Sequence, residues 1–192
     1  MKINKSITFI NLQMSAIDKC ADFWYNVNCS SVSYTEERNM YKELILKLSE
    51  GNGFVKINPP CPEKKIKRAE KAVGYPFPKE LRELLSELDG DGWLLWSAKE
   101  IVENIELNRE SLFPFFEENF SKEEYIDRVD RFIFFAGNGC GDYYCYRVRN
   151  DGVPDESVIY IWEHENIDEK CCWRAVASNM AEFITRYYEG EI

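Results

Sequence analysis

The chain has 192 residues, of which 45% are hydrophobic and 30% are charged, and its formal net charge is −10. This composition is typical of a globular protein and excludes a disordered chain. No apolar run approaches the roughly 20 residues that a membrane helix needs, and residues 1–11 lack the pattern of a signal peptide. We therefore expect a cytoplasmic protein with one main domain, alone or with an extension.

The negative charge is unevenly distributed along the chain. Residues 1–61 hold seven Lys/Arg and six Asp/Glu, whereas residues 62–192 hold the other 17 basic and 28 acidic residues, a net charge of −11. An acidic domain repels phosphate backbones, so direct nucleic-acid binding is disfavoured and a basic protein partner is favoured. The alternative is that the charge serves solubility alone.

The first 59 residues are expected to form two helices. Apolar residues recur at helical spacing over 6–27 and 35–49. The proline-rich segment 58–62 then marks a boundary, because successive prolines exclude helix. Two short helices bury too little surface to fold alone, so we interpret residues 1–59 as an N-terminal helical extension packed on the main domain, residues 60–192.

A helical hairpin opens the main domain. The spacing of apolar residues predicts helices over 62–73 and 78–89, joined at a Gly/Pro corner. The short apolar run Trp93–Trp96 predicts a strand. Two capping boxes follow, the first beginning at Ser97, before a helix that runs to about residue 107, and the second at Ser121, before a short helix or turn. The aromatic residues between them, among which are Phe113, Phe115, Phe116 and Phe120, are expected to plug one end of the core.

Three apolar and aromatic runs over 132–163 predict an antiparallel meander. The expected strands are Phe132–Ala136, Asp142–Arg149 and Ser157–Glu163. The first break, residues 137–141, contains three glycines and implies positive φ angles or a close backbone approach. The second break, Asn150-Asp151-Gly152, is a hairpin signal. A further short strand over 171–176 and a last helix capped by Ser178 complete an α+β fold, a mostly antiparallel sheet flanked by helices.

Catalytic chemistry has one candidate pair in this sequence. His164 is the single histidine, and Cys140 in the glycine-rich turn is a candidate nucleophile for it. Nothing nearby orients the base or builds an oxyanion hole, so a structural role for both residues is favoured. The same turn lacks the Gly-Lys-Ser/Thr of a phosphate-binding loop and leads into Asp142, which has the wrong charge for phosphate.

The seven cysteines do not have the spacing of a metal site. Their number is odd, no CxxC pair occurs, and no export signal accompanies them, which favours free and mostly buried thiols. Structural zinc more usually shows two short Cys/His pairs. We expect no metal and no cofactor.

The order of motifs resembles the SMI1/KNR4 (SUKH) superfamily. The similar segments are Pro60–Gly74 and Phe77–Leu85 for its first two helices, Asp89–Trp93 for the turn after them, Gly139–Tyr144 and Ile161–Glu165 for two strands, and Ala177–Ile184 for the closing helix. One departure is Asp89, where an Asn is more usual. The resemblance covers about residues 60–189 and leaves residues 1–59 outside it.

This resemblance implies a non-catalytic α+β domain. Bacterial members are commonly immunity proteins that bind and neutralise a polymorphic or contact-dependent toxin, often a nuclease. We therefore expect a cognate toxin, basic in charge, as the partner; the sequence does not give the oligomeric state. The expected partner surface consists of Asp91, Trp93, Asp142, Tyr144, Glu163 and His164.

Two other functions stay open. The first is a regulatory module that binds a small ligand or a peptide. The second and less favoured is a cysteine-dependent enzyme that uses Cys140 and His164.

Overall fold

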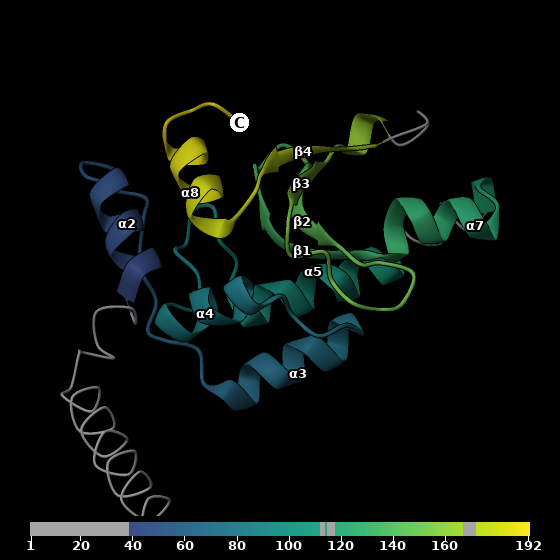
Figure 1. Ribbon diagram of the computed structural model, residues 1–192, viewed down its shortest axis with the longest axis horizontal. Helices are drawn as coiled ribbons and strands as arrows, with labels where there is room; N and C mark the ends of the chain where they lie inside the picture. The colour runs from purple at the N-terminus through teal and green to yellow at the C-terminus, as the bar shows by residue number, and fades with distance from the viewer. Residues whose placement is uncertain (1–38, 112–113, 115–117, 167–171) are drawn as a thin grey trace, which may run out of the picture. The chain divides into compact units, whose positions relative to one another are not determined.

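The computed structural model describes residues 39–111, 114, 118–166 and 172–192 (Figure 1). Asn39–Ile192 form one compact unit. The expected helix over 6–27 and the aromatic residues Phe113, Phe115 and Phe116 lie outside the described residues.

A four-stranded antiparallel sheet lies at the centre of this unit. Its strands are β1 (Phe132–Gly137), β2 (Tyr143–Arg147), β3 (Ile159–Trp162) and β4 (Trp173–Ala177). They lie in sequence order, β1-β2-β3-β4, which is a meander. The predicted α+β class and the predicted meander are confirmed.

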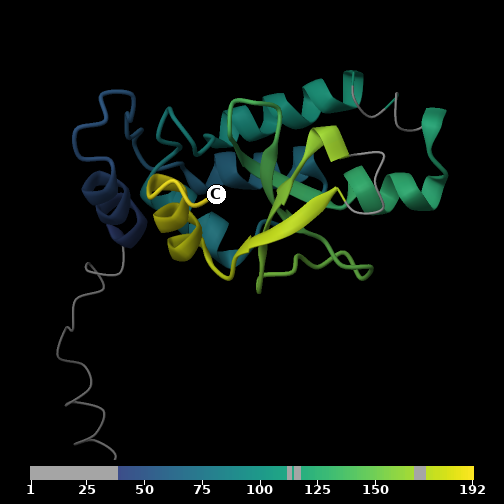
Figure 2. The same cartoon turned by 90° about the horizontal axis from the view of Figure 1, so that it is seen from above.

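Six α-helices of the described chain surround the sheet. They are α2 (Met40–Leu48), α3 (Glu63–Val73), α4 (Lys79–Glu87), α5 (Ala98–Glu110), α7 (Lys122–Tyr125) and α8 (Met180–Tyr188). Figures 1 and 2 show α3, α4 and α5 together on the β1 side of the sheet, with α8 and α2 at one end and α7 at the other. Within the part of the chain that the structure describes, no helix is both long enough and apolar enough to cross a membrane.

The alternation of side chains along the strands gives the sheet two buried faces. On one face, Phe183 of α8 packs on the rings of Phe135 and Tyr144, with centroid distances of 5.4 and 4.8 Å. On the other, Trp162 donates a hydrogen bond from Nε1 to the carbonyl of Arg128, 2.8 Å away, in the π-helical turn that follows α7. Helical segments therefore cover both sides of the strands.

The prediction of a strand at Trp93–Trp96 is wrong. Only Leu95 pairs there, in an isolated bridge with Ala136. The reason is the carboxylate of Asp91, which accepts hydrogen bonds from the backbone amides of residues 93, 94 and 95 and so folds them into a turn. In a β-strand, successive amides point alternately to opposite sides, so three consecutive amides that all bond one carboxylate cannot belong to a strand.

The helix termini follow the local sequence closely. Both predicted capping boxes are formed, at Ser97 and at Ser121. The cap of α8 differs from the prediction: the side chain of Asn179, not Ser178, accepts the Glu182 amide, 2.9 Å away. Ser178 instead donates its hydroxyl hydrogen bond to the Glu182 carboxylate.

Residues 39–59 belong to the same compact unit as the rest. Tyr41 and Ile45 of α2 are fully buried in the shared core. The carboxylate of Glu87 accepts the Tyr41 and Lys42 amides at 2.7 and 3.1 Å, which ties the start of α2 to the end of α4. The division of the chain at residue 59 stays a prediction.

Candidate partner-binding surface

Asp142 and His164 form a polar pair at the end of the sheet where β1 turns into β2. His164 Nδ1 lies 2.8 Å from Asp142 Oδ1, and the His164 amide donates to the same oxygen at 3.1 Å. The amide side chain of Asn138 donates to the other carboxylate oxygen at 2.9 Å. Burial raises the pKa of Asp142, but these hydrogen bonds outweigh it and hold the pKa below its ordinary value.

The glycine-rich turn is shaped to bring this pair together. Gly139 and Gly141 have φ angles of +75° and +105°, as the three glycines predict. Asn138 Oδ1 accepts the amides of Cys140 and Asp142 at 2.8 and 3.2 Å, which closes the turn. The backbone thus presents Asp142 to the imidazole across the end of β3.

A second charged pair lies beside the first. Glu163 Oε1 accepts a hydrogen bond from Arg174 Nε at 3.1 Å, and Asn166 donates to the other oxygen at 2.9 Å. Glu163 follows β3 and Arg174 lies in β4, so their contact joins the two strands at the same end of the sheet. Arg174 is more than half exposed, so the pair is offered to solvent.

The C-terminal part of α8 borders both Tyr144 and Trp93. The side chain of Tyr187 lies beside that of Trp93, and its ring meets Tyr144 edge-on, with centroids 5.9 Å apart. Burial raises the pKa of Tyr187, and the nearby Asp91 and Cys140 raise it further. The structure brings together three of the six expected residues, Asp142, Glu163 and His164, at one end of the sheet. Trp93 lies beside Tyr187 of α8.

The other two expected residues lie inside the domain. Asp91 is fully buried and, besides its three backbone amides, accepts the hydroxyl of Tyr188 at 3.1 Å. Tyr144 is also buried, and this burial raises its pKa to about 12. Asp91 fixes the backbone at Trp93, Tyr144 packs on Phe183 and Tyr187, and neither presents its side chain to a partner, which corrects the expectation that all six lie on one surface.

The candidate cysteine lies in the same turn but is not engaged by the histidine. Cys140 is exposed, whereas Cys61, Cys145 and Cys172 are buried. In the described part of the chain, no hydrogen bond joins the Cys140 thiol to His164, whose Nδ1 is held by Asp142. Among the same residues, no group of His, Cys, Asp and Glu is placed to hold a metal ion.

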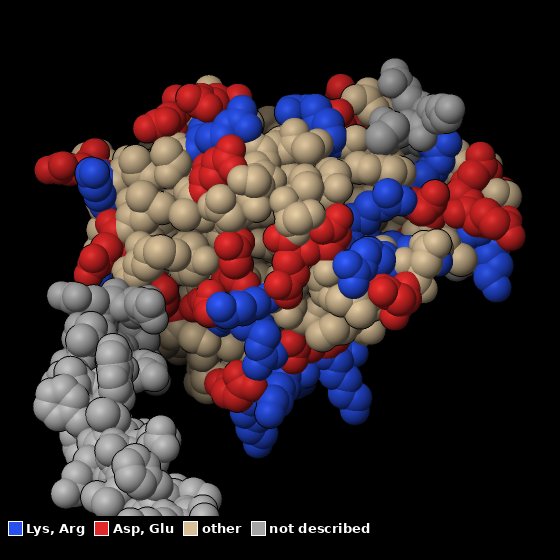
Figure 3. All heavy atoms as spheres, in the orientation of Figure 1, with Lys and Arg blue, Asp and Glu red and all other residues tan. Residues whose placement is uncertain are grey.

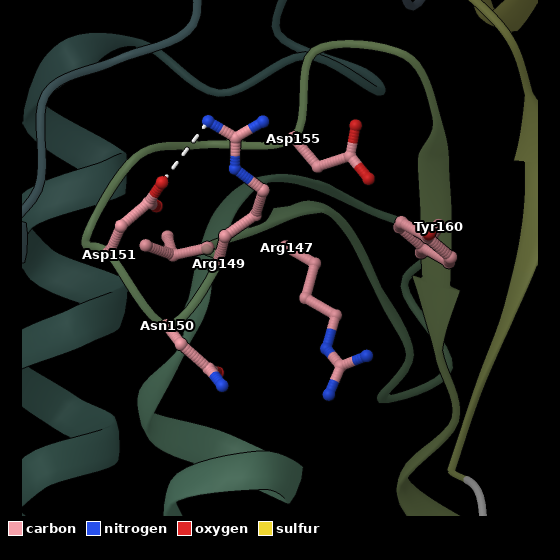
Figure 4. Close-up of a pocket in the computed structure, with 7 residues that line it drawn as sticks. Arg147, Arg149, Asn150, Asp151, Asp155 and Tyr160 are labelled. Atoms are coloured by element: carbon pink, nitrogen blue, oxygen red, sulfur yellow. Dashed lines mark ion pairs between the residues drawn. The ribbon is translucent and has the colours of Figure 1, made fainter.

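A cavity of about 470 Å³ lies at the opposite end of the β2–β3 hairpin. Arg147 and Arg149 line it, but their guanidinium groups point in different directions (Figure 4). Arg147 is 2.8 Å from the Asp127 carboxylate and stacks over Trp173, while Arg149 pairs with Asp151 at 3.4 Å. A site for a small ligand is usually apolar with a few converging polar groups, and this cavity has neither property.

Comparison with known families places this arrangement in a wider group. The model of the SMI1 / KNR4 family (SUKH-1) matches residues 60–186. A comparison with curated proteins found no match. The matched residues include the whole sheet and the Asp142–His164 pair, whereas α2 and the segment after it precede them.

Proposed function

Because the chain belongs to the SMI1/KNR4 (SUKH-1) family, we propose that it is a non-catalytic immunity protein that binds and neutralises a cognate toxin in the cytoplasm. The observation that carries this proposal is the partly exposed group of Asp142, Glu163 and His164, which hydrogen bonds hold at one end of the sheet, together with the exposed Trp93. The side chains of this group are held by hydrogen bonds before any partner arrives, so binding costs little ordering of side chains.

Charge supports a basic toxin as the partner. Residues 62–192 carry a net charge of −11, which attracts a basic protein and speeds its association. In the face drawn in Figure 3, acidic and basic side chains surround a broad area of uncharged residues. A nuclease bound in this way would have its nucleic-acid groove occluded.

The geometry gives the cysteine-dependent enzyme less support than the binding protein. A nucleophile needs its base within hydrogen-bond reach. Asp142 does hold His164 through Nδ1, which corrects the expectation that nothing orients this base, but in the described chain no hydrogen bond joins the imidazole to the Cys140 thiol, whose residue is held through its backbone amide by Asn138. The discriminating measurement is the rate at which Cys140 is alkylated at neutral pH, which an activated thiolate would raise above that of an ordinary cysteine.

Growth rescue by co-expression tests the proposal directly. The probe is the toxin domain encoded next to the gene of this chain, expressed with and without the chain. We expect the chain to restore growth and to co-purify with the toxin domain. The control is Leu107→Ala, which truncates an exposed residue of α5 and should restore growth as well as the wild-type chain does. Continued growth arrest together with no detectable complex contradicts the proposal.

A further inference from the structure

An aromatic stack on the surface reaches beyond the family-matched region. Phe54 lies before residue 60, yet its ring stacks on Trp93 with a centroid distance of 5.4 Å and an interplanar angle of 26°. After this contact the two residues are still 73% and 48% exposed. Phe54 is the most exposed large hydrophobic residue in the described chain. Single exposed apolar residues are common, but a stacked aromatic pair that stays exposed to water forms an apolar patch of the kind that binds a partner.

The segment that carries Phe54 is held firmly against the turn that carries Trp93. The Lys56 amide donates to the Asp91 carbonyl at 2.7 Å, and the Asn58 amide donates to the Gly90 carbonyl at 3.1 Å. The side chain of Asn52 accepts the Phe54 amide at 3.0 Å, which fixes the local bend. Backbone hydrogen bonds after Phe54 and the Asn52 side chain before it therefore position the two rings, and the surface is pre-formed.

The stack also has acidic surroundings. Trp93 contacts Tyr187, and Tyr188 donates its hydroxyl to Asp91 beneath the turn, so the C-terminus of α8 borders the pair. The segments 50–57, 89–96 and 186–192 together carry five acidic residues and two basic ones, Lys56 and Arg186. Asp91 is buried and Glu191 pairs with Arg186 at 3.0 Å, so the excess of exposed negative charge beside the stack is small but has the sign that attracts a cation. An aromatic face in a negative field favours a cation, and the guanidinium of arginine is the side chain that best combines charge with a flat stacking surface.

We propose that the Phe54–Trp93 stack is the anchor of the interface, and that it takes an arginine side chain of the basic partner. This inference rests on the proposed function and adds to it the partner chemistry and a role for the segment that precedes the family-matched region. Interface energy concentrates in a few central aromatic and arginine residues, which is the combination that the stack would form.

Calorimetric titration of the chain with the toxin domain encoded beside its gene tests the anchor. We expect Phe54→Ala and Trp93→Ala to raise the dissociation constant about 30-fold or more, because truncation of an aromatic hot spot costs about 2 kcal/mol or more. Phe54→Tyr keeps the ring and should stay within about threefold of wild type. Leu107→Ala, which truncates a residue that is 59% exposed on α5, is the matched control and should change binding less than twofold.

The outcomes separate the anchor from the proposed function. If wild type binds the toxin domain and Phe54→Ala binds equally well, the anchor is overturned while the proposed function stands. If wild type neither binds nor rescues, both fall. Sedimentation of each variant tests the alternative that the stack binds a second copy of the chain. A wild-type dimer that Phe54→Ala dissociates would show this and would contradict the proposal. Thermal unfolding verifies that each variant is folded.

Discussion

The imidazole of His164 lies directly over Gly141, so close that a Cβ atom at Gly141 would be 2.7 Å from the ring carbon Cε1. The same glycine has a φ of +105°, a conformation that residues with a side chain rarely adopt. Two independent constraints therefore require glycine here, one from the backbone and one from the ring that Asp142 holds in place.

Gly141→Ala should destabilise the protein by about 3 kcal/mol or more, because backbone strain and a steric clash with the held imidazole add together. Gly139→Ala is the matched control. Its φ is +75° and no atom lies near its added Cβ, so only the conformational cost, about 1–2 kcal/mol, should appear. Urea unfolding of both variants measures the difference. Equal losses in the two would show that the imidazole moves aside freely.

The buried carboxylate of Asp91 should be one of the more costly side chains to remove. Asp91→Ala leaves three backbone amides without their acceptor, and we expect a loss of about 4 kcal/mol in the free energy of unfolding. Asp91→Asn keeps one oxygen for the amides and should lose about half as much. Tyr188→Phe removes only the hydroxyl contact and should cost about 1 kcal/mol. Denaturant titration ranks the three, and the reverse order would contradict the assignment.

The Asp142–His164 pair predicts a pH dependence of stability. The pKa of Asp142 is held below its ordinary value of 3.8, so the folded chain binds this proton less readily than the unfolded chain does. Its stabilising contribution is complete above that ordinary pKa and is lost as the pH falls through the lowered folded value. Asp142→Asn should therefore weaken the fall in stability below about pH 4. Unfolding midpoints from pH 6 downward test this.

The control for this pH profile is Glu103→Gln, which removes an exposed carboxylate of α5 that pairs with Lys99 at 3.0 Å. This variant should keep the wild-type slope in acid, since exposed ion pairs contribute little to stability. A slope in Asp142→Asn that matches both wild type and the control would show that this carboxylate is not a source of acid sensitivity.

Charge reversal at Glu163 should slow association with a basic toxin. Glu163→Lys removes the partner of Arg174 and places two positive charges at the end of the sheet. We expect the association rate with the toxin domain to fall about fivefold at low salt and the difference to shrink as salt rises. Glu103→Lys changes the net charge equally on α5 and should have a smaller effect. Stopped-flow mixing at two salt concentrations gives both rates, and equal effects would point to net charge alone.

The helices and the meander could be predicted from local sequence. The stripe of apolar residues in α4 and the capping boxes at Ser97 and Ser121 are set by neighbours within a few residues, so the sequence predicts them. The cap of α8 was missed by one residue, because Ser178 and Asn179 are both good caps. Only the direction in which the chain enters the helix selects Asn179.

The candidate surface was harder to predict. Asp91 and Trp93 are two residues apart, yet one is fully buried and the other is half exposed. An acidic residue before a run of apolar ones indicates a turn but does not show that its carboxylate will face inward. Phe54 carries no distinguishing signal, since an aromatic residue after Gly51-Asn52-Gly53 is as compatible with the core as with the surface.

The sequence by itself determined the family, the α+β class and the pairing order of the strands, because these depend on motifs and on periodic burial along the chain. Only the tertiary structure decided which side chains meet across long distances in sequence. It brought Asp142 to His164 and Phe54 to Trp93, while it turned Asp91 and Tyr144 inward. Such contacts depend on how separate elements pack, and no local pattern encodes that packing.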